Sequence, residues 1–375
     1  MGIKETMLYG GDVDMIESAV RICRGYLHGA WKKIGPQDVT VKRLSGGLSN
    51  ILYHVQLNHP SESTRPKQVL LRLYGQTQCE GALENLITES VIFTLLSERK
   101  IGPKLFGIFP GGRIEEYIPA SPLKPEEMSD PQVNPLVAET IAAVHCMNVP
   151  INKEPRWIWD TIQRWLNTIP DTTPCGNPLE QELLSFNLQE ELDWLKSHLS
   201  KVPSPVVFCH NDLQQGNILR HNTCPEKIVI IDFEYCAYNY RGFDLANHFI
   251  EWTYDYNQPK HPYFGAFKDR YSSPQQMKKF IEVYLQALFA RDTHQSKLEV
   301  NNVKSIMKEI KHYTLASHLL WGVWAIVQSR VSKITFGYCE YAHERLTSYY
   351  KLKNAILAGS KEQTAAVKRK VIELD

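Results

Sequence analysis

Two short polar motifs in this 375-residue chain could bind phosphate and a metal ion. The first is CHNDLQQGN at positions 209–217, where His210, Asp212 and Asn217 fit an H-x-D-x-x-x-x-N spacing. In that pattern the Asp lies beside an acceptor hydroxyl and the Asn binds metal. The second motif is an apolar run from 228 that ends in Asp232 and Phe233, which is typical of a buried strand delivering a second metal-binding carboxylate.

In this order and at this spacing, the two motifs predict phosphoryl transfer from ATP. That reaction needs mainly carboxylates and amides that hold Mg²⁺ and aim a hydroxyl at the γ-phosphate. We expect Asp212 to hold the acceptor hydroxyl, and Asn217 and Asp232 to bind Mg²⁺. Gln214 of the same loop could contact phosphate or metal, whereas His210 is expected to brace the loop through backbone hydrogen bonds. A lone H-x-D would mean little, because His and Asp often serve as turn residues.

The elements that must position these motifs follow from the hydrophobic pattern. The pattern predicts an α+β chain with a small antiparallel β lobe at 1–118, a hinge at 119–130 rich in proline, and a larger α-rich lobe at 131–375. Helices are predicted at 13–27 and 83–98, and strands at 39–44, 51–57, 68–74, 105–109 and 113–118.

The loop between the first two predicted strands could bind the nucleotide phosphates. Its glycines allow backbone N–H groups to approach a phosphate, with hydroxyl and amide donors beside them. Taken alone, a glycine-bearing hairpin is more often only a turn, and the position of this loop before the other kinase-like elements makes the two interpretations about equal. The candidate residues are Gly46, Gly47, Leu48, Ser49 and Asn50.

Arg72 lies in an otherwise apolar strand, where a cation is costly unless it is paired. Glu89 of the following helix is the expected partner, in a pair that would position the ATP phosphates. A purely structural salt bridge is the alternative. Glu115 and Glu116 precede the hinge, where adenine usually meets backbone groups, although their side chains could simply be solvated.

Bulk composition narrows the partners and the compartment. Lys and Arg total 42 against 41 Asp and Glu, so nucleic acid and membrane surfaces are not expected as general partners. The eight cysteines form no C-x-x-C pair and no apolar leader opens the chain, which favours a reducing cytoplasm. The apolar run 315–327 is too short to span a bilayer and is predicted to be a core helix, so no transmembrane segment is expected.

The residues around both motifs resemble a known family. VVFCHND at 206–212 and IDFEYCAYNYRGFDLANHFIEW at 231–252 closely resemble the choline/ethanolamine kinases, specifically the choline kinase branch. The similarity runs from the Gly46 loop to about Tyr350. It implies a bilobal protein-kinase-like fold, ATP and Mg²⁺, phosphorylation of choline on the route to phosphatidylcholine, and a homodimer. Aminoglycoside phosphotransferases share the first motif but not the long second one.

A choline site can also be argued from the residues. A quaternary ammonium has no N–H to donate, so aromatic faces and a nearby carboxylate must recognise it. Trp321 and Trp324 share one helical face, although such a stripe is more often core packing. The resemblance implies that the pocket is lined by Tyr235, Tyr256, Trp321, Trp324, Phe336 and Tyr341, with Glu251 near the ammonium. It also implies that Asp244 anchors the catalytic loop and that Arg241 and Asn247 brace the same framework.

Three departures argue against a protein kinase. The glycine loop lacks a G-x-G-x-x-G pattern, Asp232-Phe233 is followed by Glu234, and the strand cation is Arg72. An ethanolamine kinase stays open as an alternative, but Trp252 favours choline because ethanolamine-specific relatives tend to lose it. A non-catalytic nucleotide-binding scaffold is the third possibility, and the intact trio Asp212, Asn217 and Asp232 argues against it.

Overall fold

The computed structural model describes residues 12–44, 50–74 and 82–372 of the chain. The chain divides into two compact units. Unit 1 comprises Met1–Ser121 and Leu219–Glu234, and unit 2 comprises Pro122–Ile218 and Tyr235–Asp375. The predicted division into lobe, hinge and lobe stays a prediction. The segment that carries Asp232 belongs to unit 1, together with the N-terminal strands.

Unit 1 is built on a five-stranded antiparallel sheet with the order β1-β2-β3-β5-β4. The predicted strands are confirmed, because alternating apolar residues face the core, as along β3. A bulge between Leu105 and Gly107 interrupts the β4 pairing. The strands are β1 (Val39–Leu44), β2 (Asn50–Leu57), β3 (Gln68–Tyr74), β4 (Leu105–Phe109) and β5 (Gly112–Glu116).

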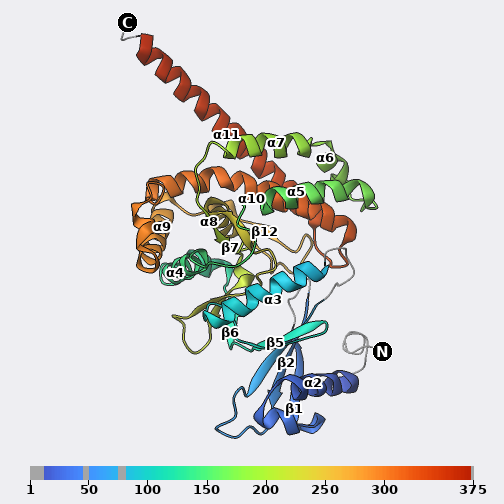
Figure 1. The fold of residues 1–375 in the computed structure, drawn as a ribbon. Coiled ribbons are helices and arrows are strands. Elements are labelled where there is room, and N and C mark those ends of the chain that lie inside the picture. Colours follow the sequence, from blue (N-terminus) through green and yellow to red (C-terminus); the bar gives the residue numbers. More distant parts are fainter. Residues whose placement is uncertain (1–11, 45–49, 75–81, 373–375) are drawn as a thin grey trace. The chain divides into compact units, whose positions relative to one another are not determined.

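Two helices accompany this sheet in unit 1, α2 (Asp12–Tyr26) and α3 (Ala82–Glu98). α2 buries Ala19 and Cys23, spaced one turn apart, in a core shared with the sheet residues Val55, Val69 and Leu71. Figure 1 shows α2 beside the strands in blue. Helix and sheet thus form the layered core that sets the position of β3 and its Arg72.

A second, three-stranded sheet with the order β6-β8-β9 carries the second motif. Its strands are β6 (Ala120–Pro122), β8 (Ile218–His221) and β9 (Ile228–Ile230). β9 is fully buried, as the apolar run predicts, and Asp232 follows two residues after its end. The chain there takes a positive φ of 64° at Asp232, which turns it sharply out of the strand.

Unit 2 is helical apart from two short antiparallel strand pairs. β7 (Val206–Cys209) pairs with β10 (Ala237–Tyr240), and β11 (Tyr254–Asp255) pairs with β12 (Gly265–Ala266). Its helices are α4 (Asn134–His145), α5 (Trp157–Thr168), α6 (Leu179–Ser185), α7 (Leu188–Leu199), α8 (Arg241–Glu251), α9 (Pro274–Arg291), α10 (Val303–Val331) and α11 (Tyr338–Ile372).

The core of unit 2 is formed where α10 packs against α8 and α11; Figure 1 shows α10 in orange and α11 in red. α10 contains the apolar run 315–327, and every residue of that run except Trp324 is buried, which confirms a core helix. Helix starts match their sequences: the Asn302 side chain caps α10, and Ser273 with Gln276 forms a capping box before α9.

Within residues 12–44, 50–74 and 82–372, no helix combines the length and the apolar character needed to cross a membrane.

Candidate active site

Helix α8 organises the site because it is buried along its whole length although it is rich in polar residues. All eleven of its residues are buried. A buried polar group is costly unless it finds a partner, so each polar side chain of α8 must be matched by another element. The polar members are Arg241, Asp244, Asn247, His248 and Glu251.

Asp244 holds the loop that is predicted to be catalytic. Its two carboxylate oxygens accept hydrogen bonds from the backbone N–H groups of His210, at 2.9 Å, and Asn211, at 2.8 Å. His145 Nε2 lies 3.0 Å from one of the same oxygens. Burial by itself would raise the pKa of Asp244, but these hydrogen bonds and the neighbouring histidines hold that pKa below its usual range. The expected anchoring role of Asp244 is confirmed.

The loop itself is fixed around Asp212. Asn211 has a positive φ of 68°, and its side-chain amide donates to the Tyr235 carbonyl at 2.8 Å. The Asp212 N–H donates to His210 Nδ1 at 3.2 Å, which confirms that His210 braces the loop. Backbone held in this sparsely populated region indicates a conformation imposed by the surrounding contacts.

The structure brings Asn217 and Asp212 together. Asn217 Nδ2 donates to Asp212 Oδ2 at 2.8 Å and to the Asp212 carbonyl at 2.9 Å. The Asn217 side-chain oxygen is therefore the atom that does not face Asp212. Gln214 Oε1 accepts the Gly216 N–H at 2.7 Å and caps the short 3₁₀ turn Gln215–Asn217, so this oxygen has a structural use.

A cluster of His145, Cys209 and Asp244 has its potential metal-binding atoms within 4.8 Å of one another. Each group is already used, since His145 Nδ1 lies 2.9 Å from the Tyr284 hydroxyl and the Cys209 thiol donates to the Asn239 carbonyl. Burial raises the pKa of Cys209 well above its usual range, so this thiol is expected to be inert. We interpret the cluster as support for the catalytic loop.

In unit 1, Arg72 lies near Asp232. Arg72 Nη1 is 3.8 Å from Asp232 Oδ1, and Arg72 Nε donates to Glu115 Oε1 at 2.8 Å. Glu115 is buried, so the alternative that its side chain is solvated is wrong. Burial would raise the pKa of Glu115, but Arg72 and Arg113 together hold it below its usual range. The Glu89 side chain, the partner predicted for Arg72, lies outside the described residues.

The other predicted nucleotide residues are only partly described. Gly46, Gly47, Leu48 and Ser49 lie outside the described residues, and Asn50 begins β2 with its side chain not described. Glu116 is exposed, and its Oε2 accepts the Lys104 N–H at 3.1 Å.

The rings predicted to line the acceptor pocket form one connected cluster in unit 2. Tyr235 meets Trp321 edge to face at 5.5 Å between ring centroids, and Trp321 meets Trp324 at 5.6 Å. Trp324 then contacts Tyr341 at 6.5 Å, which extends the cluster to the first turn of α11. These distances are typical of aromatic pairs.

Two further rings complete this cluster. Phe336 lies 5.8 Å from Tyr341, and Tyr256 lies 6.4 Å from Phe336 and 6.1 Å from Tyr341. The six predicted rings, Tyr235, Tyr256, Trp321, Trp324, Phe336 and Tyr341, are named the ring cluster below. Asn247 positions one of them, because its Oδ1 accepts the Trp321 Nε1–H at 2.9 Å and the Ser317 hydroxyl at 2.8 Å. This contact confirms the bracing role expected of Asn247.

Glu251 lies at the edge of the ring cluster, as predicted, but it has a partner that the sequence analysis missed. Arg345 of α11 donates from Nη2 to Glu251 Oε1, and the Tyr256 hydroxyl donates to Glu251 Oε2 at 2.8 Å. Arg345 lies four residues after Tyr341, on the same helical face. This i, i+4 spacing is the sequence signal that could have placed Arg345 beside the predicted pocket.

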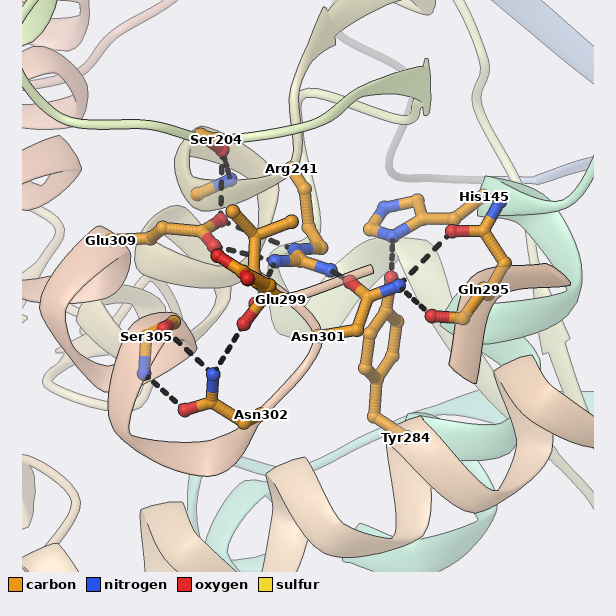
Figure 2. Close-up of polar contacts among 12 residues, drawn as sticks. His145, Ser204, Arg241, Tyr284, Gln295, Glu299, Asn301, Asn302, Ser305 and Glu309 are labelled. Atoms are coloured by element: carbon orange, nitrogen blue, oxygen red, sulfur yellow. Dashed lines mark hydrogen bonds and ion pairs between the residues drawn. The ribbon is translucent and has the colours of Figure 1, made fainter. Parts of the chain in front are cut away.

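Arg241 braces the other end of α8, as expected. Its Nη2 and Nε donate to the two carboxylate oxygens of Glu309 at 2.5 and 3.1 Å, and Nη1 donates to Asn301. Figure 2 shows the guanidinium between Glu309 and Asn301, with Ser204 bonded to the same carboxylate. This fully bonded pair ties α8 to the start of α10.

A sheet-bearing unit with a paired arginine, and a helical unit with a loop in which Asn217 holds Asp212, are typical of an ATP-dependent kinase. Comparison with known proteins agrees with this class. The family described as choline/ethanolamine kinase matches residues 41–350, and the chain belongs to this family.

Individual relatives support this assignment. The chain is 41% identical to a human choline/ethanolamine kinase over 348 residues, covering 92% of this chain and 87% of the relative. It is 40% identical to mouse choline kinase alpha, covering 89% and 80% respectively. A solved choline kinase from Cryptosporidium parvum Iowa II superposes with a TM-score of 0.76 at 28% identity, covering 93% of this chain and 97% of that structure. The predicted α+β, protein-kinase-like fold is confirmed.

Proposed function

We propose that this kinase transfers the γ-phosphate of ATP to the hydroxyl of choline, giving ADP and phosphocholine, the first step on the route to phosphatidylcholine. The observation that supports choline most strongly is the ring cluster beside Glu251. Aromatic faces attract a methylated cation through their quadrupole without needing an N–H donor. The same unit holds Asp212, the group proposed to receive the acceptor hydroxyl.

Asp212 is proposed to hold the choline hydroxyl and to take its proton late in the reaction. Asn217 bonds to one of its carboxylate oxygens at 2.8 Å and so fixes the carboxylate's orientation. The anchoring of the loop by Asp244 keeps this geometry fixed before the substrate arrives. A fixed carboxylate that orients the acceptor oxygen lowers the barrier mainly through positioning.

Mg²⁺ is proposed as the metal that accompanies ATP. The side-chain oxygen of Asn217 and the carboxylate of Asp232 are proposed to hold it, because hard oxygen donors suit this cation. When bound, the ion neutralises charge on the phosphates. Proposed nucleotide contacts are Gly46, Gly47, Leu48, Ser49, Asn50, Arg72, Glu89, Glu116 and Gln214. A cytoplasmic location and a homodimer are proposed from the family resemblance.

A kinase that acts on ethanolamine, alone or with choline, is the second candidate. The human relative's name covers both substrates. Trp252 favours choline from sequence, and in the structure this side chain is buried against Phe249 at 5.1 Å between ring centroids.

The test is a side-by-side turnover assay with choline, ethanolamine, an aminoglycoside and a peptide as acceptors. We expect phosphocholine formation that requires ATP and Mg²⁺, with the highest kcat/KM for choline. For Asp212→Ala we expect kcat to fall about 10²- to 10⁴-fold with little change in nucleotide affinity. Absence of phosphocholine from folded protein supplied with ATP and Mg²⁺ would reject the proposal. Unchanged turnover in Asp212→Ala would contradict the role given to Asp212.

A further inference from the structure

Arg345 is a charged side chain enclosed at the edge of the ring cluster. It is 0% exposed, and its guanidinium lies over the Tyr254 ring at 4.2 Å and over the Tyr341 ring at 5.0 Å. Its Nε donates to the Tyr341 hydroxyl at 2.9 Å, and its Nη2 donates to Glu251. Arg345 therefore contacts both the carboxylate and one wall of the proposed acceptor pocket.

These contacts give each oxygen acceptor at this end of the pocket a hydrogen-bond donor from the protein. Glu251 Oε1 receives Arg345 and Oε2 receives Tyr256. The Tyr341 hydroxyl receives Arg345 and lies 3.0 Å from the Tyr256 hydroxyl. The arginine and the carboxylate also cancel in charge, since an arginine stays protonated. A cation entering the pocket thus meets ring faces and an already neutralised carboxylate.

Primary and quaternary ammonium ions respond differently to such a site. A primary ammonium carries N–H donors that lose their water partners on binding and need oxygen acceptors in return. A quaternary ammonium has no N–H, so it binds to ring faces near a carboxylate without needing a free oxygen acceptor. An N–H donor that loses water and finds no acceptor in the site costs binding free energy. A ligand without that N–H avoids this cost.

We propose that Arg345 is a specificity-determining positioning residue, which holds Glu251 and Tyr341 so that the pocket selects quaternary over primary ammonium. This inference rests on the proposed function of the ring cluster as the acceptor site. Arg345 acts through Glu251 and Tyr341 and does not touch the reacting atoms.

The test is Arg345→Met, which removes the charge and keeps a long apolar side chain. Glu251 then loses its countercharge and becomes an acceptor for a primary ammonium. We expect the ratio of kcat/KM for choline to kcat/KM for ethanolamine to fall by about tenfold or more, because a charge-assisted hydrogen bond is gained only by ethanolamine. KM for ATP should change little.

Arg241→Met is the matched control, because it breaks another buried arginine–glutamate pair on the same helix. It should leave the substrate ratio unchanged. An unchanged ratio in folded Arg345→Met, or an equal shift in Arg241→Met, would overturn the inference. Wild-type protein that makes no phosphocholine would instead reject the proposed function, so the two failures are distinguishable.

A second measurement needs no variant. In wild-type protein, tetramethylammonium should inhibit choline phosphorylation with a Ki about tenfold or more below that of methylammonium. Equal inhibition, or stronger inhibition by methylammonium, would show that acceptors for N–H groups remain available and would contradict the role given to Arg345. Arg345→Lys, which keeps the charge but not the planar fork, should give a smaller shift in the ratio than Arg345→Met.

Discussion

The two ends of helix α8 carry the same chemical unit in two different surroundings. At the N-terminal end Arg241 pairs with Glu309, and at the C-terminal end Glu251 pairs with Arg345. The side chains of both pairs are at most 3% exposed. Around Arg241 lie amide and hydroxyl groups, whereas around Arg345 lie aromatic rings.

The surroundings determine what each pair can do. All three guanidinium nitrogens of Arg241 donate to protein oxygens. Nη1 of Arg345 has no hydrogen-bond partner among the described residues, and its pair borders the ring cluster. A buried ion pair gives little net stability by itself but is costly to break. We therefore expect the first pair to control stability, and the second to control substrate choice as well.

The largest expected effect comes from breaking the framework pair. Arg241→Met leaves Glu309 buried without its countercharge, and we expect a loss of about 3–5 kcal/mol in the free energy of unfolding. Urea denaturation followed by circular dichroism measures this loss. A variant as stable as wild type would contradict the role in stability given to Arg241. A folded variant with a higher kcat/KM for ethanolamine than for choline would contradict the separation of roles between the two ends.

Between the two charged ends, His248 is kept neutral inside the same helix. Its Nδ1 donates to the Leu213 carbonyl at 3.3 Å, its Nε2 accepts the Trp252 Nε1–H at 3.3 Å, and burial lowers its pKa to about 4. The unfolded chain, with a histidine pKa of about 6.5, binds the proton first as pH falls. Stability from His248 is therefore complete above pH 6.5 or so and is lost between there and about pH 4.

The loss attributable to His248 should reach roughly 3 kcal/mol at the low end of this window. Urea unfolding of wild type and His248→Asn at several pH values tests this, since Asn can still donate to Leu213 but does not titrate. The variant should show a shallower dependence of stability on pH between 6.5 and 4. Identical slopes would mean that other groups cause the acid sensitivity.

The smallest expected effect is at the ring cluster. Trp324→Ala removes one half-buried ring of the proposed acceptor site, so KM for choline should rise about 3- to 30-fold while KM for ATP stays near wild type. Trp194→Ala is the matched control, because Trp194 also has a cation over its ring, Lys353 at 4.1 Å, but lies on α7 away from the cluster. Equal changes in both KM values for Trp324→Ala would indicate a packing role.

Local patterns predicted much of the fold. The bounds of β1, β3 and β4 match those expected from alternating apolar residues, because each strand has one face in the core. The ion pair between Arg72 and Glu115 is a feature that local patterns did not predict. In the sheet Arg72 pairs with Arg113, which places Glu115 diagonally across on the same face, between both cations. Strand register between segments 43 residues apart is not contained in either segment.

The sequence by itself determined which groups we propose for the chemistry: the Asp212 loop, the carboxylate after β9, and the rings of α10 and α11. The spacing within each motif is short-range, and the family resemblance adds the use of the rings. Only the tertiary structure decided that the charge of Glu251 is balanced by an arginine. Its partner, Arg345, is 94 residues away on another helix. A carboxylate's effect on a cation depends on what else it bonds to, and that is set by how α8, α10 and α11 pack.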